Sequence, residues 1–223
     1  MAPHPLAPDF EALSWLWSAL DREHRLSQLG WLPHGSTPWR IIEKLPEAEV
    51  SAVMARFCCE NWSIIRRFFE ESIDKCEVDS EAKATFREAL EAHEIGLYRT
   101  VPRRLFPEIE RVSRIEFPDA PPRSFASQRE LRAWLGHLLP RDVAPPGMVG
   151  WELSKRLMRQ LYKNAEDSVS LDSMRLDPVP NRHAAIHGLI SYSTLQSSFN
   201  ALVMTDFAFQ VICVVKERRR RKA

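Results

Sequence analysis

Signals for β-strands are scarce in this sequence. It contains only seven glycines, and alternating runs of Val, Ile and Thr bounded by tight turns are missing. Apolar residues recur instead at helical spacing through most of the chain. We therefore predict an all-α fold, in which 223 residues with 44% hydrophobic side chains can bury a sizeable core.

The sequence also lacks an excess of charge of either sign. Its 31 Lys and Arg residues and 30 Asp and Glu residues leave a formal net charge of +1. A chain with this balance has no global basic field to attract nucleic acid, so any contact with RNA must come from a local patch.

Cysteine is rare as well. The four cysteines include no CxxC pair of the kind used in zinc or redox sites, and they are Cys58, Cys59, Cys76 and Cys213. Adjacent cysteines cannot easily bridge each other. We expect reduced, mostly buried thiols in a cytoplasmic protein.

We expect neither a signal peptide nor a membrane span. The N-terminus lacks a basic stretch followed by an uninterrupted apolar run. Residues 199–215 are strongly apolar and precede a basic segment, but Asn200, Asp206 and Gln210 interrupt them. A spanning helix needs about 20 mostly apolar residues, and a charged side chain inside a membrane is costly. This segment is therefore predicted to be the central helix of a bundle.

The chain is predicted to have three parts, which are an N-terminal helical region at 1–78, a helical bundle at 79–216 and a basic tail at 217–223. Helices are predicted at 9–29, 39–45, 48–75, 81–98, 103–117, 129–139 and 151–165, with a long final helix after a capping-box pattern at Ser193 and Gln196. The segments 118–127 and 166–180 are predicted to be loops.

The segment PNRHAAIHG at residues 180–188 carries the side chains best suited to chemistry. Histidine has a pKa near neutrality, so His187 suits proton transfer. Arg182 presents a planar, always charged fork that matches phosphate oxygens. Asn181 is expected to cap a short helix that ends at Gly188, and the free N–H groups at its start favour a phosphate. Metal-independent RNA cleavage needs such a base or acid and such a cation.

This segment resembles the motif of the HEPN superfamily, in which an Arg is followed by a polar residue and then, a few residues later, by a His. Here the three are Arg182, His183 and His187, and they precede the last long helix of a helical chain. HEPN proteins are helical bundles, and many are RNases that use no metal. The resemblance covers the chain from about Glu81 onward, and PEIERVSR at 107–114 looks like the glutamate-bearing second helix of a subset of bacterial HEPN-like proteins of unassigned function.

The spacing of Arg182 and His187 raises a geometric difficulty. Five positions on a regular helix place two side chains roughly 140° apart. They converge within one chain only if Arg182 lies in a frayed first turn. The HEPN resemblance implies another solution, in which two copies dimerise and both motifs line one cleft. A homodimer would then be part of the active site.

Two further residues are candidates for supporting roles, each with an alternative. Glu110 can orient Arg182 or His187, although an ion pair with Arg111 or Arg114 is the commoner arrangement. Tyr192 can stack on a base or close the end of the bundle.

Basic rows and a histidine pair complete the candidates. Lys155, Arg159 and Lys163, together with Arg103 and Arg104, form a candidate phosphate track, for which a solvated charged face is the ordinary alternative. The terminal RRRRK run is expected to be an unstructured solubilising tail. His183 and His187 could hold a metal from one helix face, but no nearby Cys or carboxylate supplies a third ligand, so we expect no metal.

Three hypotheses follow. The first is a cytoplasmic, homodimeric endoribonuclease of HEPN type that cleaves RNA without a cofactor, as a toxin or antiviral effector, with a regulatory protein as a candidate further partner. The second is a non-catalytic HEPN-like module that binds RNA or a nucleotide, or scaffolds a partner. The third is a helical adaptor that docks a partner through the Trp-rich N-terminal region, with Trp15, Trp17, Trp31 and Trp39.

Overall fold

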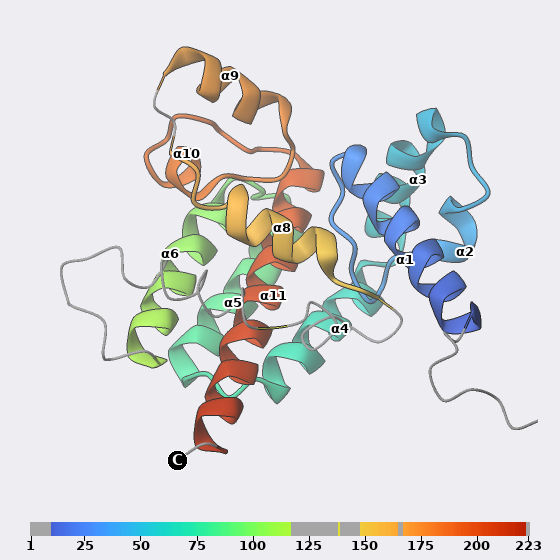
Figure 1. Cartoon of the computed structure of the whole chain (residues 1–223). Coiled ribbons are helices and arrows are strands. Elements are labelled where there is room, and N and C mark those ends of the chain that lie inside the picture. The colour runs from blue at the N-terminus through green and yellow to red at the C-terminus, as the bar shows by residue number, and fades with distance from the viewer. Residues whose placement is uncertain (1–9, 117–137, 139–147, 165–166, 222–223) are drawn as a thin grey trace, which may run out of the picture.

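A computed structural model describes residues 10–116, 138, 148–164 and 167–221 (Figure 1). These residues form helices and no strands, which confirms the all-α prediction. The helices are α1 Phe10–Gln28, α2 Trp39–Ile42, α3 Glu47–Glu60, α4 Trp62–Lys75, α5 Ser80–Glu94, α6 Thr100–Glu116, α8 Trp151–Arg159, α9 Ser168–Leu176, α10 Arg182–Ile186 and α11 Leu195–Arg220. The loop predicted at 118–127 and most of the helix predicted at 129–139 lie outside the described residues.

Helix α11 is the central helix, as its sequence predicts. It packs against α4, α5, α6 and α8, and it runs through the middle of the bundle in Figure 1. Phe199 and Phe209 are fully buried on it. By length and composition this helix also passes as a candidate membrane span, and 83% of its apolar window is buried inside the protein. A helix that is apolar nearly all round fits the core of a bundle.

Both ends of α11 differ from the prediction. The capping box is formed by Thr194 and Ser197, one residue later than predicted, and the Thr194 hydroxyl accepts from the Ser197 N–H at 3.1 Å. At the other end the helix continues to Arg220, so the expected unstructured tail is wrong up to that residue. Arg220 pairs with Glu77 at 2.6 Å, and this contact favours continuation of the helix.

The helix predicted at 48–75 is two helices, α3 and α4. Asn61 separates them with φ −115° and ψ 21°, and its side-chain amide donates to the Phe57 carbonyl at 3.1 Å. The apolar period does not reveal this break, because the buried positions continue at spacings of three or four on both sides of it. These positions are Val50, Met54, Cys58, Trp62, Ile65, Phe69 and Ile73.

The polar segment 166–180 contains a helix where a loop was predicted. Asp167 caps α9 by accepting from the Ser170 N–H at 2.7 Å. Met174 is the buried residue of this helix, so it has almost no apolar periodicity for a sequence reading to detect. The preceding helix α8 also ends earlier than predicted, at Arg159, because the chain turns there to bury Leu161 and Tyr162.

One hydrophobic core joins the N-terminal helices to the rest. It extends from Leu26 on α1 to Val215 on α11, so the domain boundary predicted at residue 78 falls within a shared core. Buried Asn200 on α11 ties these parts together. Its side chain accepts from the Leu32 N–H at 2.9 Å and donates to the carbonyls of Gly30 and Pro178 at 2.7 and 3.2 Å.

Candidate functional site

The motif lies on α10, a short helix whose start is fixed by Asn181. The Asn181 side chain accepts from the Ala184 N–H at 2.9 Å, which confirms its predicted capping role. Its amide group also donates to the carbonyls of Gln160 and Lys163, both at 2.7 Å. Asn181 is 0% exposed, so it joins the end of α8 to α10 and is not itself open to a ligand.

Arg182 is held against α6. Its Nη2 donates to Glu110 Oε2 at 2.8 Å, and the side chains are 21% and 11% exposed. Of the roles considered for Glu110, orientation of Arg182 is therefore the one observed. Arg111, the expected competitor, pairs with Glu108 and Asp79 at 2.6 and 2.7 Å. The Nε atom of Arg182 is buried with no hydrogen-bond partner in the described part of the chain.

His183 on α10 and the C-cap residue His187 are in contact with each other. Their ring centroids are 4.6 Å apart and the ring planes are nearly perpendicular, at 77°. His183 is half-buried and His187 is exposed. The pKa of His183 is lowered by burial and by electrostatic interaction with His187 and Arg182, which favours its neutral form.

Helix α10 ends beside an arginine of α6. His187 is the C-cap residue, and Gly188 follows with φ +70°. A Cβ atom placed on Gly188 would be 4.0 Å from Nη2 of Arg103. Arg103 is exposed and forms no ion pair within the described residues, whereas its neighbour Arg104 pairs with Glu88. Of the predicted phosphate track, Arg103 thus lies beside the residue that follows His187.

The row Lys155, Arg159 and Lys163 is not continuous in the structure. Lys155 pairs with Glu152 at 3.5 Å, and Lys163 lies beyond the end of α8. Arg159 is the exposed last residue of that helix. A row at intervals of four requires an unbroken helix, so the track predicted on this face is interrupted.

Tyr192 is buried and binds the backbone just before α10. Its hydroxyl accepts from the Asn181 N–H at 3.1 Å, and the side chain is 7% exposed. Burial raises the pKa of Tyr192 to about 12, so the phenol stays protonated. Of the two predicted roles, this buried position fits closure of the bundle end. It does not fit stacking on an RNA base, because the ring is covered.

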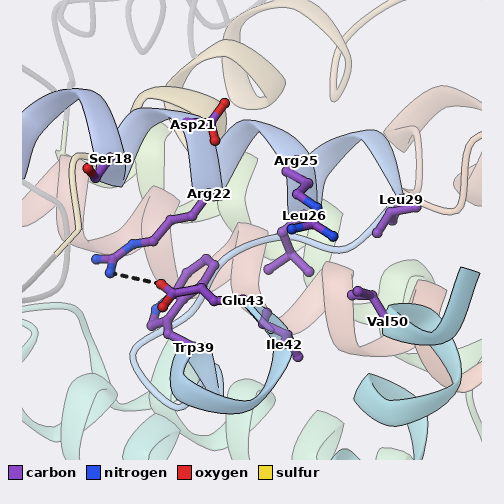
Figure 2. Close-up of a pocket in the computed structure, with 10 residues that line it drawn as sticks. All are labelled: Ser18, Asp21, Arg22, Arg25, Leu26, Leu29, Trp39, Ile42, Glu43 and Val50. Carbon is purple, nitrogen blue, oxygen red and sulfur yellow. Dashed lines mark hydrogen bonds and ion pairs between the residues drawn. The ribbon is translucent and has the colours of Figure 1, made fainter. Parts of the chain in front are cut away.

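A second candidate site is a pocket of about 400 Å³ between α1, α2 and α3 (Figure 2). The Arg22 guanidinium lies 4.9 Å from the centre of the Trp39 ring and pairs with Glu43 at 3.4 Å. Apolar side chains line the other side, and they are Leu26, Leu29, Ile42 and Val50. No sequence motif marks this pocket, because its lining comes from three separate helices.

The charges in this pocket compensate one another. Its ionisable lining residues are Asp21, Arg22, Arg25 and Glu43, two of each sign. Arg25 also donates to the Leu45 carbonyl at 2.7 Å. The pocket therefore offers a phosphate little net attraction.

The Trp-rich N-terminal region is divided between core and surface. Trp31 is 1% exposed, and Trp39 forms a wall of the pocket. Trp15 and Trp17 on α1 are 51% and 70% exposed. Two of the four tryptophans proposed to dock a partner are therefore available at the surface.

No group of three or more His, Cys, Asp or Glu side chains in the described segments could hold a metal ion. Comparison of the chain with protein-family models, curated proteins and solved structures found no match. The chemistry of α10 is therefore the basis for assigning a function.

Proposed function

We propose that α10 and the facing part of α6 form the active site of a HEPN-type endoribonuclease that cleaves RNA without a metal. The observation that best supports this proposal is the contact between His183 and exposed His187, with the guanidinium of Arg103 beside the next residue, Gly188. Cleavage of a phosphodiester by an adjacent hydroxyl requires groups that transfer protons and a cation beside the phosphate.

The reaction assigns one proton transfer to each side of the phosphorus. A base removes the proton of the 2′-hydroxyl, the 2′-oxygen attacks phosphorus, and an acid protonates the departing 5′-oxygen. The products are a 2′,3′-cyclic phosphate and a 5′-hydroxyl. His183 is suited to the role of base because its lowered pKa favours the neutral ring. His187 is exposed and can approach the leaving oxygen.

This reaction also supports a site shared by two copies. The attacking and leaving oxygens lie roughly in line across the phosphorus, so base and acid act from opposite sides. Rings whose centroids are 4.6 Å apart on one helix approach from the same side. A second copy of α10 across the phosphate supplies the missing side, so the proposed active unit is a homodimer with a composite cleft.

The positive charges have different roles in this proposal. Arg103 is exposed and contacts the phosphate directly. Arg182 supplies a more buried charge whose orientation is fixed by Glu110 at 2.8 Å. A guanidinium has five donors, so the one bond from Nη2 to Glu110 leaves others for a phosphate oxygen.

The first experiment is cleavage of an RNA pool in EDTA by purified wild type and by His187→Ala, Arg182→Ala and Arg103→Ala. General acid–base groups contribute about 10²- to 10⁴-fold, so we expect at least about a 10²-fold loss in His187→Ala. Arg40→Ala, which removes an exposed arginine on α2, is the matched control and should cleave at the wild-type rate. Unchanged cleavage in both His187→Ala and Arg182→Ala would rule out this site.

The second experiment tests the shared cleft. Inactive His187→Ala and Arg182→Ala subunits are mixed and allowed to exchange. If each site takes Arg182 from one copy and His187 from the other, the mixed dimer has one complete site and activity returns. A site built within one chain gives no recovery, because neither subunit has both residues.

The ion pair between Arg182 and Glu110 also supports an alternative function. An ion pair between a guanidinium and a carboxylate can hold α10 against α6 just as well as it can serve catalysis. In this alternative the protein is a non-catalytic module that binds RNA or a nucleotide at Arg103. Binding without cleavage by the wild type, weakened in Arg103→Ala, would favour it.

A further inference from the structure

Two cysteines far apart in sequence lie where the end of α4 packs against α11. Cys76 is the C-cap residue of α4, and it faces the side of α11 that carries Cys213. Gln210, one helical turn before Cys213, donates to the Cys76 sulfur at 3.1 Å. Lys216, one turn after Cys213, donates to the Glu77 carbonyl, so Cys213 lies on α11 between two side chains that contact residues 76 and 77.

The two thiols differ in access and in acidity. Cys76 is 2% exposed, whereas Cys213 is half-buried. The pKa of Cys213 is lowered because Cys76 hydrogen-bonds to its sulfur, and because the Glu77 backbone and the Lys216 ammonium also stabilise the thiolate. The pKa of Cys76 is raised by its contact with Cys213 and by burial. Cys213 is therefore the thiol that ionises first and that a solute can reach.

We propose that Cys76 and Cys213 form a reversible disulfide when the protein meets a hydroperoxide. The Cys213 thiolate attacks the outer peroxide oxygen, the O–O bond breaks, and Cys213 becomes a sulfenic acid while the peroxide leaves as alkoxide or hydroxide and takes a proton from water. The Cys76 sulfur then attacks the Cys213 sulfur. The S–O bond breaks, and the hydroxyl leaves as water with the Cys76 proton.

The disulfide would tie the end of α4 to the central helix. It would close a loop that contains α5, α6, α8, α9 and α10, which includes every element of the proposed RNA site. A cross-link across so long a loop restricts the unfolded chain strongly. The oxidised protein should therefore unfold at a higher temperature than the reduced protein.

The other two cysteines provide an internal comparison. Burial raises the pKa of Cys58 to about 12, and the adjacent Cys59 is exposed. Accessibility alone would direct oxidation to Cys59. The proposal predicts instead that the disulfide forms at the less exposed Cys213, because Cys213 has a second thiol beside it, whereas Cys59 has only its chain neighbour Cys58.

The experiment treats the reduced full-length protein with a few equivalents of hydrogen peroxide, then blocks free thiols with N-ethylmaleimide under denaturing conditions. Trypsin should release a linked pair of peptides, 76–83 and 183–216, and dithiothreitol should separate them. Peptide 57–66, which carries Cys58 and Cys59, should remain alkylated. In Cys76→Ser the reaction should stop at a sulfenic acid on Cys213, which dimedone traps.

Several outcomes would overturn the proposal, and one of them needs no variant. In that outcome, the peroxide-treated wild type gives no linked 76–83 and 183–216 peptides, and both cysteines are found alkylated after denaturation. Alternatively, Cys59 would be oxidised first and the product would be a disulfide between two chains. A Cys213→Ser variant that still consumes peroxide at Cys76 at the wild-type rate would contradict the assigned order of attack.

Discussion

Arg182 on α10 donates to the carboxylate of Glu110 on α6 at 2.8 Å, and the two side chains are only 21% and 11% exposed. The pair is thus largely removed from water, unlike the surface ion pairs of this protein. It connects the helix that carries the histidines to the helix that carries Arg103. Its strength should influence both stability and the geometry of the proposed site.

Glu110→Gln should destabilise the protein by about 2 kcal/mol, because a half-buried guanidinium loses its charged hydrogen-bond acceptor. Asp172→Asn is the matched control, since the Arg175–Asp172 pair is 54% and 65% exposed. Exposed pairs contribute about 0–1 kcal/mol, so this variant should be nearly neutral. Urea unfolding at pH 7 measures the stability of both variants. Equal losses of stability would show that the Glu110–Arg182 pair contributes no more than an exposed pair.

The fold was predictable where the signal is local. The core helix α11 is recognised from its apolar length, and the Asn181 cap follows from one side chain and the next three residues. Helix α9 was missed because it buries little besides Met174. The break at Asn61 was missed because the buried positions of α3 and α4 continue at the same spacing.

The site was predictable only in part. The sequence places His183 and His187 four apart, and the structure brings their rings into contact. The partner of Glu110 was not predictable, because Arg182 is 72 positions away while Arg111 and Arg114 are adjacent on the same helix. The position of Arg103 beside Gly188 likewise depends on how α6 and α10 pack, which no local pattern encodes.

Gly30 should tolerate substitution far less than Gly96, although both have positive φ. A Cβ on Gly30, at φ +74°, would be 2.2 Å from Cγ of Pro178. A Cβ on Gly96, at φ +78°, would meet nothing within 4 Å. Gly96→Ala should therefore cost about 1–2 kcal/mol from backbone strain alone. Gly30→Ala should cost about 1–3 kcal/mol more, because the close approach of α1 to the segment before α10 must open.

Differential scanning calorimetry of both glycine variants checks this prediction. The melting temperature should fall clearly further in Gly30→Ala than in Gly96→Ala. Similar shifts would show that Pro178 moves aside at little cost, and that backbone strain is the whole effect.

Asn181→Ala should destabilise the protein more than Thr194→Ala, although each removes a helix N-cap. Loss of a cap costs about 1 kcal/mol, and we expect that value for Thr194, which is exposed. Asn181 is 0% exposed and also satisfies the carbonyls of Gln160 and Lys163. Unsatisfied buried groups cost about 1–3 kcal/mol, so the Asn181 variant should lose at least about 3 kcal/mol in total.

Chemical denaturation gives these differences, and hydrogen exchange locates them. Amides of α10 should exchange faster in Asn181→Ala and should be unaffected in Thr194→Ala. If both variants lose about 1 kcal/mol, the Asn181 amide group adds nothing beyond an ordinary cap.

Stability should fall as the pH drops from 7 to 5, mainly because of two buried histidines. The pKa of His34 is lowered to about 3 and that of His93 to about 4, both by burial. In the unfolded chain both histidines become protonated near pH 6.5, whereas in the folded chain they stay neutral until the pH falls to 3–4. Stability is therefore complete above pH 6.5 and is lost below it, by about 2 kcal/mol per histidine at pH 5.

Buried Asp206 should act in the opposite direction. Burial raises its pKa to about 6, so the folded chain keeps a proton that the unfolded chain releases near pH 3.8. Its ionisation lowers stability as the pH rises towards 7, and acidification to pH 5 recovers about 1 kcal/mol. The net loss between pH 7 and pH 5 should then be about 3 kcal/mol.

Unfolding free energies between pH 4.5 and 8 separate these contributions through two variants. His93→Gln removes one titrating group and should flatten the acid limb by about 2 kcal/mol at pH 5. Asp206→Asn can still accept the hydrogen bond that the Ser72 hydroxyl donates at 2.5 Å, and should gain stability at pH 8 relative to wild type but not at pH 4.5. Parallel curves for wild type and both variants would mean that water reaches these groups and that their pKa values are ordinary.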